Sequence, residues 1–288
     1  MRNLLELPYQ QVIRTIQQSL ENYHPKPIRR QSIPKPGSNQ MRKLGIPTAT
    51  DRVVQECVRM ILEPILEAQF FPHSYGFRPY RDTAMAMART TTLVHNTGHS
   101  WVVEGDIKQY FDTINHTKLI KQLWHMGIRD CRVLMIIKQM LKAGVMNEVT
   151  VNPMGTQQGG IISPLLANVY LNSFDWFIAK SWENKHTKTH YAYTRGRMRA
   201  LKLRSRLKPA YLIRYCDDWV LITDTKGNAE KWKQIIQRKL AAQFKLTLSE
   251  EKTKLTNLRK KSIDFLGFTY KYGVLSTTIK RLPKSSPR

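Results

Sequence analysis

AYLIRYCDDWVLI, residues 210–222, places two adjacent acids between two runs of residues that favour β-strands. The pattern predicts a hairpin, with Tyr211 to Tyr215 and Trp219 to Ile222 as its arms and Asp217 and Asp218 at the bend. Aspartate is a common turn residue, so a solvated turn is the simplest interpretation of this stretch alone. Adjacent carboxylates also repel each other, and a functional acid pair is the alternative.

Acids are scarce in the rest of the chain, which carries 47 Lys and Arg against 21 Asp and Glu, a formal net charge of +26 at pH 7. Residues 26–43 hold six Lys or Arg and no acid, and residues 181–210 hold nine against one. Such clusters bind polyanions or acidic membrane surfaces, or form a solvated basic face. Because Tyr191, Tyr193 and Trp182 lie among the cations of the second block, phosphate binding with base stacking is favoured, which predicts nucleic-acid binding.

Other classes of protein and of site are disfavoured by what the sequence lacks. The three cysteines form no CxxC pair and the eight histidines no HExxH motif, so neither a disulfide framework nor a zinc site is predicted. No apolar run approaches the roughly 18 residues of a membrane span, and the N-terminus is polar at helical spacing, unlike a signal peptide. We therefore expect a folded cytoplasmic protein with no membrane partner.

Hydrophobic periodicity predicts a mixture of helices and strands. The first 20 residues favour a helix, followed by an extended basic loop, and Asp51 is the expected cap of the next helix, in which Pro64 allows a kink. Further helices are predicted over 132–145, from Ser163 and over 228–243, and strands over about 100–106, 147–151, 211–222 and 265–275. The pattern indicates an α+β fold with helices packed on a mainly antiparallel sheet.

A third acid, Asp106 in SWVVEGDIKQYFDTI, follows a predicted strand 111 residues before Asp217. If the two strands are neighbours, three carboxylates come together in a basic protein that binds polyanions. Clustered carboxylates hold two magnesium ions for phosphoryl transfer, where one metal lowers the pKa of an attacking hydroxyl and the other neutralises a triphosphate. The arrangement predicts nucleotide addition.

Seven stretches carry a resemblance to a known family: IPKPGSNQMRKLGIPTATDRVVQECVRMILEPI, SYGFRPYRD, EGDIKQYFDTI, GTQQGGIISPLLANVYLN, YCDD, LSEEKTKL and FLGF. They resemble, in the family's order, the blocks of the reverse transcriptase domain of a group II intron-encoded protein, also called a maturase. The first two stretches match fingers blocks, the third the palm block, the fourth the template and nucleotide block, the fifth the catalytic hairpin, the sixth the block after it and the seventh the primer grip. The helix before them resembles the family's N-terminal extension. The resemblance implies an α+β fold of right-hand polymerase fingers and palm, with an antiparallel palm sheet, packed helices and no thumb in these 288 residues.

The resemblance also implies roles for single residues. Asp106, Asp217 and Asp218 match the catalytic acids, which with the Ile107 carbonyl would bind two Mg²⁺ ions. The matches to nucleotide-binding residues are the triphosphate cations Lys35 and Arg42, the sugar-contacting Phe111, the loop residues Gln158 and Gly159, and Lys252 as proton donor to pyrophosphate. The simpler interpretations are loop charges for the cations and core packing for Phe111.

The basic side chains expected to contact nucleic acid are Arg29, Arg30, Arg78, Arg81, Arg195, Arg197, Arg199 and Arg204. The implied domains are an N-terminal extension and fingers at 1–95, completed by part of 145–165, and a palm at 96–288 with a basic insertion at 181–210. The implied partners are group II intron RNA, an RNA template with a DNA primer, and deoxynucleoside triphosphates. Whether the chain forms a homodimer stays open.

The implied function is RNA-directed DNA synthesis, which makes the protein a nucleotidyltransferase encoded by a mobile element. The same protein would also bind its intron RNA and assist its splicing and mobility. A splicing cofactor with an idle polymerase site is one alternative, and a reverse transcriptase of retron or diversity-generating type is another. The chain departs from the family pattern at Gln157 and Lys43, where Pro is common, and at Cys216, where Ala is common.

Overall fold

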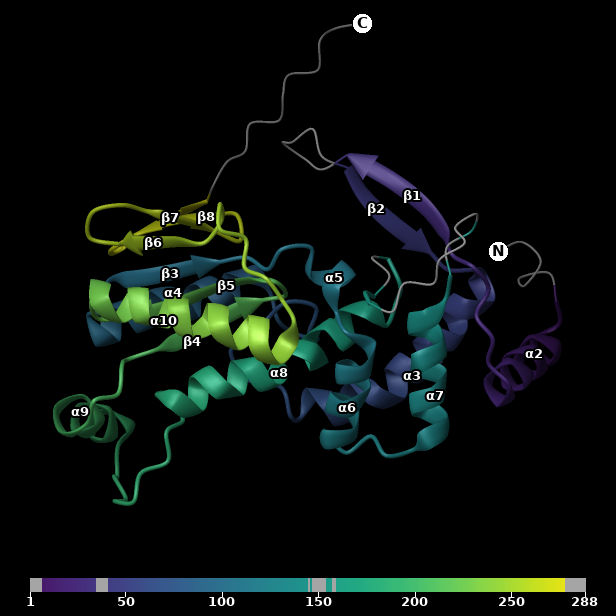
Figure 1. The fold of residues 1–288 in the computed structure, drawn as a ribbon, viewed down its shortest axis with the longest axis horizontal. Coiled ribbons are helices and arrows are strands. Elements are labelled where there is room, and N and C mark those ends of the chain that lie inside the picture. Colours follow the sequence, from purple (N-terminus) through teal and green to yellow (C-terminus); the bar gives the residue numbers. More distant parts are fainter. Residues whose placement is uncertain (1–6, 35–40, 145, 147–153, 157–158, 278–288) are drawn as a thin grey trace, which may run out of the picture. The chain divides into compact units, whose positions relative to one another are not determined.

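The computed structural model describes residues 7–34, 41–144, 146, 154–156 and 159–277 (Figure 1). The chain forms two compact units. Unit 1 comprises Met1–Phe71, Ile107–Phe174 and Lys239–Thr247, and unit 2 comprises Pro72–Asp106, Asp175–Arg238 and Leu248–Arg288. Each unit is assembled from segments far apart in the sequence, and the contiguous fingers and palm ranges stay a prediction.

Unit 2 is built on a four-stranded antiparallel sheet in the order β4-β5-β3-β6 (Figure 1). Its strands are β4 (Tyr211–Tyr215), β5 (Asp218–Thr223), β3 (Trp101–Gly105) and β6 (Lys254–Asn257). Aromatic and aliphatic residues of β4 and β5 are buried in succession, as expected for strands covered on both faces. The predicted hairpin and antiparallel sheet are confirmed, whereas β6 was not foreseen.

Unit 2 also contains the helices α4, α9 and α10. α4 (Thr83–Thr97) begins at Asp82, whose carboxylate accepts a hydrogen bond from the Met85 N–H, and packs against β4 and β5. α10 (Lys226–Lys239), predicted over 228–243, buries Trp232 and Ile236. α9 (Thr194–Arg204) lies in residues 181–210, called the basic segment from here on, and Leu201 is the one buried residue of this helix. α9 therefore presents most of its side chains to solvent.

A second, three-stranded antiparallel sheet in unit 2 comprises β7 (Ile263–Phe265), β8 (Phe268–Lys271) and β9 (Val274–Thr277). The strand predicted over 265–275 is divided because the chain reverses twice within it, at 266–267 and at 272–273. Each reversal is a two-residue turn that ends in glycine, a sequence typical of tight hairpins.

Unit 1 is mainly helical. It contains α2 (Tyr9–Glu21), α3 (Ala49–Glu67), α5 (Tyr110–Thr113), α6 (His116–His125), α7 (Cys131–Lys142), the first part of α8 (Ser163–Ser181) and the π-helix η1 (Leu240–Phe244). In its core the Tyr170 hydroxyl donates to the Phe244 carbonyl at 2.6 Å, and the two rings meet edge to face. None of the described helices is both long and apolar enough to span a membrane.

An antiparallel hairpin of β1 (Arg29–Pro34) and β2 (Met41–Ile46) lies where an extended basic loop was predicted. The loop prediction is wrong over these residues, which pair as two strands. The strand was missed because β1 is exposed along its whole length. With neither face buried, its side chains show no apolar alternation that would mark a strand. Pro34 stands at the strand end, where its missing N–H costs least.

The start of α3 differs from the prediction by three residues. Thr48 is the N-cap: its hydroxyl accepts from the Asp51 N–H and donates to Asp51 Oδ2 at 2.6 Å. The Tyr23 hydroxyl donates to the other Asp51 oxygen at 3.0 Å. Asp51 is therefore the acidic partner in a capping arrangement and not the cap itself. The strand predicted over 147–151 lies outside the described residues.

Candidate active site

The hairpin brings its two acids to the same end of the sheet as Asp106. Tyr215 pairs with Asp218, so Cys216 and Asp217 form a two-residue turn, with Cys216 at a φ of +58°. β3 runs antiparallel to β5 with Gly105 opposite Trp219, and Asp106 follows Gly105 directly. The expectation that these two strands are neighbours is confirmed.

The three acids interact through their charges. Burial, followed by the negative charges of Asp217 and Asp106, raises the pKa of Asp218 to about 7. The Asp106 side chain is 12% exposed, and its Oδ2 lies 2.9 Å from the Lys252 ammonium nitrogen. The negative charges of Asp106, Asp217 and Asp218 therefore repel one another, and a nearby cation would relieve that repulsion.

Lys252 precedes β6 and supplies part of that positive charge. Partial burial disfavours its ammonium, but the hydrogen bond to Asp106 and the charges of Asp106, Asp218 and Asp217 raise the pKa of Lys252 above its ordinary value. Lys252 therefore stays protonated at neutral pH beside the acid cluster.

The donor chemistry of the cluster fits a hard divalent cation. Carboxylate oxygens are the ligands that Mg²⁺ prefers, and the pKa of Asp218 is raised by desolvation and then by repulsion from Asp217 and Asp106, which a cation would relieve. Within the described residues, no group of three or more His, Cys, Asp or Glu side chains is arranged so that it could hold a metal ion. The ligand types therefore fit the expected magnesium, while Lys252 holds one Asp106 oxygen in this structure.

Unit 1 contains most of the residues predicted to contact the nucleotide. Phe111 is half-buried on α5, with its ring edge-on to Tyr110, and its carbonyl accepts from the Thr156 N–H at 2.7 Å. Gly159 has a φ of +112°, and a Cβ there would lie 2.9 Å from the Gly45 carbonyl oxygen. Only glycine therefore allows this loop to approach β2 so closely.

The other predicted nucleotide and metal contacts are less well defined by the structure. Arg42 is exposed on β2, and Ile107 is buried next to Asp106 in the sequence. Lys35 and Gln158 lie outside the described residues, as does Gln157. The nucleotide-binding roles stay predictions.

The predicted RNA-binding arginines differ in their surroundings. Arg78 is 7% exposed, with Nη1 donating to the Ser74 carbonyl at 2.7 Å. Arg81 donates to the Pro72 carbonyl and lies over the Tyr75 ring, and Arg197 donates to the Glu183 carbonyl at 2.7 Å. The exposed arginines are Arg29, Arg30, Arg195, Arg199 and Arg204. For all eight side chains, contact with nucleic acid stays a prediction.

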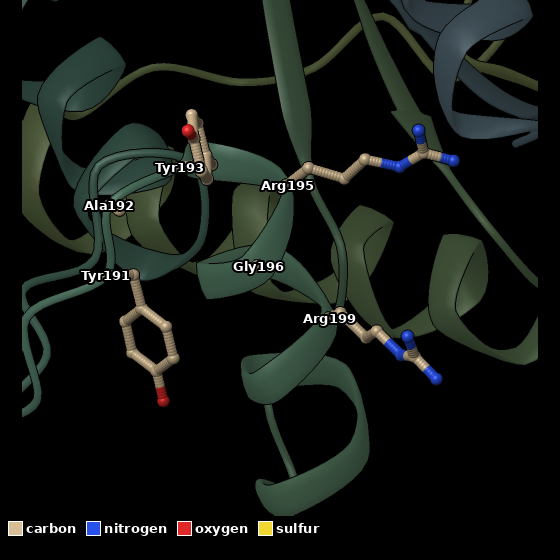
Figure 2. Close-up of a pocket in the computed structure, with 6 residues that line it drawn as sticks. All are labelled: Tyr191, Ala192, Tyr193, Arg195, Gly196 and Arg199. Carbon is tan, nitrogen blue, oxygen red and sulfur yellow. The ribbon is translucent and has the colours of Figure 1, made fainter.

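An open cleft of about 480 Å³ lies in the basic segment, lined by Tyr191, Ala192, Tyr193, Arg195, Gly196 and Arg199. In Figure 2, Arg195 and Arg199 extend their guanidinium groups to one side of α9, while the tyrosines lie on the other. The expectation that Trp182 stacks on bases is wrong because its ring is buried, at 1% exposure. Exposed Tyr193 can still offer a ring to a base.

A buried pair of charges near the hairpin was not foreseen from the sequence. Arg214, within β4, forms an ion pair with Asp175 of α8, with Nη2 and Oδ2 2.6 Å apart and both side chains almost fully buried. The available signal was a single arginine in the otherwise apolar or aromatic strand YLIRY. Buried charges of this kind require partners, and the sequence alone does not identify them.

Comparison with known proteins gives a consistent family. The family model described as reverse transcriptase (RNA-dependent DNA polymerase) matches residues 33–270. The chain is 36% identical over 258 residues to protein YkfC of Escherichia coli (strain K12), covering 85% of this chain and 67% of that protein. It is 35% identical over 319 residues to the group II intron-encoded protein LtrA of Lactococcus lactis subsp. cremoris, covering 96% of this chain and 52% of that protein.

Among solved structures, the fold is similar to that of apo telomerase from Candida tropicalis truncated from the C-terminal domain, with a TM-score of 0.63 and 14% identity. The match covers 88% of this chain and 55% of that chain. This likeness concerns the fold alone, and it confirms the predicted fingers-and-palm class. The chain spans about half the length of both the Lactococcus protein and the telomerase chain.

Proposed function

This chain belongs to the reverse transcriptase family, and on that premise we propose that it catalyses RNA-directed DNA synthesis as the polymerase region of a group II intron-encoded protein. The observation that carries the proposal is the acid cluster at one end of the sheet of unit 2, where the buried Asp106 lies beside Asp217 and Asp218 and the three charges repel one another. Such a cluster suits metal-assisted phosphoryl transfer. A protein that only binds RNA gains nothing from carboxylates facing a phosphate backbone.

In the proposed reaction, the 3′-hydroxyl of a DNA primer loses its proton to water and attacks the α-phosphorus of a deoxynucleoside triphosphate. A phosphodiester bond forms, the bond to the β-phosphate oxygen breaks, and pyrophosphate leaves with the bonding electron pair. Asp106, Asp217 and Asp218 would hold two Mg²⁺ ions, which when bound lower the pKa of the hydroxyl and neutralise the triphosphate charge. The protonated Lys252 supports a role in giving a proton to the leaving pyrophosphate.

Further residues are proposed to select and orient the substrate. Arg42, with Lys35, would bind the triphosphate, and Gly159, with Gln158, would line the nucleotide and template. Phe111 would crowd the 2′ position of the sugar and thereby exclude ribonucleotides. Its half-buried ring supports this role over pure core packing, because a core residue would be covered on all sides.

We further propose that intron RNA is bound through the exposed arginines of the basic segment, which assists splicing. Arg195 and Arg199 lie one helical turn apart and extend in the same direction, which suits consecutive phosphates of one strand (Figure 2). An RNA-binding splicing cofactor with an idle polymerase site is the second candidate. The observation that favours it is the set of exposed arginines in the basic segment, which could bind RNA whether or not the acids are active.

Extension of a DNA primer on an RNA template distinguishes the two candidates. With Mg²⁺ and deoxynucleotides, the polymerase proposal predicts templated extension by the wild-type chain and none when EDTA removes the metal. Binding of structured intron RNA is measured in parallel. Tight RNA binding without extension would favour the splicing cofactor.

A further inference from the structure

The ion pair between Arg214 and Asp175 is unusual in being both buried and bidentate. Arg214 Nε lies 2.8 Å from Asp175 Oδ1, and Nη2 lies 2.6 Å from Oδ2. The two side chains are 1% and 0% exposed. A planar guanidinium matches a carboxylate in this two-pronged geometry, which a lysine ammonium cannot reproduce.

The same guanidinium also reaches the catalytic turn. Arg214 Nη1 donates to the Cys216 carbonyl oxygen at 2.8 Å. That carbonyl belongs to the peptide bond that leads into Asp217, and Cys216 has a left-handed φ of +58°, which is uncommon for a residue other than glycine. Arg214 therefore ties the orientation of this peptide plane to Asp175 on α8.

The loop before α4 contacts strand β4 and the turn through its backbone. The Arg214 N–H donates to the His73 carbonyl at 3.0 Å, and the Tyr75 N–H donates to the Arg214 carbonyl at 2.8 Å. A Cβ at Gly76 would lie 2.5 Å from the Cys216 nitrogen, so the loop touches the turn where only glycine fits. Gly76 belongs to the motif SYGFRPYRD, whose packing against the hairpin was not foreseen.

Stability alone does not account for a charge pair at this place. Replacing a buried ion pair by apolar residues of similar volume is often neutral or stabilising, because the desolvation of both charges is avoided. Two leucines could fill the space, but neither could donate to the Cys216 carbonyl. The distinctive capacity of Arg214 is to bind Asp175 and the turn at once.

We propose that Arg214, held by Asp175, is a positioning residue that fixes the Cys216–Asp217 peptide and thereby the metal-binding geometry of Asp217 and Asp218. The inference rests on the proposed polymerase function but concerns residues outside the acid cluster. It assigns Asp175 a role through Arg214, without contact with substrate or metal.

Two variants separate positioning from stability. Arg214→Lys keeps a buried positive charge for Asp175 but loses the fork that also reaches Cys216. The double variant Arg214→Leu with Asp175→Leu removes both charges together, so neither is left unpaired. Arg89→Lys is the matched control, because Arg89 pairs with Glu183 in the same unit and none of its hydrogen bonds in the described chain reaches residues 216–218.

The first readout is binding of Mn²⁺ alone, followed by electron paramagnetic resonance, with Asp106→Asn identifying the specific component. We expect both Arg214 variants to bind this component about 10-fold more weakly, the range in which supporting residues around metal ligands act. The melting temperature of Arg89→Lys should stay near that of the wild type, and that of the double variant should fall by a few degrees at most, because one buried carbonyl, that of Cys216, loses its donor. In primer extension, kcat should fall about 10- to 100-fold with little change in KM for the nucleotide.

Unchanged Mn²⁺ affinity in both Arg214 variants would overturn the positioning role, even if their melting temperatures fell. Absence of any Mn²⁺ binding that Asp106→Asn removes would overturn it as well. A wild-type chain that binds Mn²⁺ but does not extend primers would instead refute the polymerase function. In that case the Mn²⁺ comparison still decides whether Arg214 positions the acids.

Discussion

Shortening Phe111 to valine should change sugar selection more than stability. The ring is half-buried and contacts Tyr110 edge to face, with ring centres 5.6 Å apart. Loss of such an aromatic pair and of partial burial costs about 1 kcal/mol of unfolding free energy. Removal of a steric barrier to the 2′-hydroxyl should cost about 1–3 kcal/mol of selectivity, or roughly 10- to 100-fold. The change in selectivity should therefore exceed what misfolding explains.

The assay compares incorporation efficiencies of ribonucleotides and deoxynucleotides on one RNA template, with the melting temperature measured in parallel. Tyr110→Phe is the matched control, because it removes the hydroxyl that donates to the Ala167 carbonyl at 2.5 Å and leaves the Phe111 ring in place. This control should lose about 1–3 kcal/mol of stability without altering the ratio. An unaltered ratio in Phe111→Val, with both incorporations reduced in parallel, would refute the sugar-selecting role.

Three further predictions concern charge. Lys252→Met should slow extension about 100-fold or more through loss of a proton donor. It should change the free energy of unfolding by less than about 1 kcal/mol, because the lysine is largely exposed. An extension rate equal to that of the wild type would exclude the donor role. The double variant Arg195→Gln with Arg199→Gln should lower the slope of log affinity for intron RNA against log salt by about 1–2. The single variant Arg197→Gln, which loses an internal contact with Glu183, should lower this slope less. Equal slopes in all variants would mean that intron RNA binds at another surface. Burial lowers the pKa of His99 to about 4, so protonation favours the unfolded chain as pH falls from about 6.5 toward 4. Between pH 7 and 5, His99→Gln should therefore lose about 1–2 kcal/mol less unfolding free energy than the wild type, as measured by urea unfolding. Equal losses in the two proteins would contradict this cause.

The sequence predicts the hairpin and its neighbouring strand because both are short, apolar and bounded by acids. Strand β3 and the arms of the hairpin alternate or run apolar, and Asp106 and Asp217 mark where the chain leaves the sheet. The helices with one apolar face, such as α7 over Cys131–Lys142, are found to within a few residues for the same reason.

Elements without such a pattern could not be predicted. β1 buries neither face, and β6 is four residues long with a lysine at its start, so neither shows alternation. The partner of Arg214 is 39 residues away on a helix, and the contact of Gly76 with Cys216 joins segments 140 residues apart. These contacts depend on tertiary packing that local periodicity does not encode.

Asp217→Asn tests most directly whether the acid cluster carries polymerase chemistry. Single-turnover extension of a DNA primer on an RNA template with Mg²⁺ is measured beside intron RNA affinity and melting temperature. We expect extension to fall by about 1000-fold or more while RNA affinity and folding stay nearly unchanged, because the metal site depends on the carboxylate charge and RNA binding depends on cations outside the cluster. Extension by Asp217→Asn at the wild-type rate would contradict the assignment of this cluster as the catalytic centre.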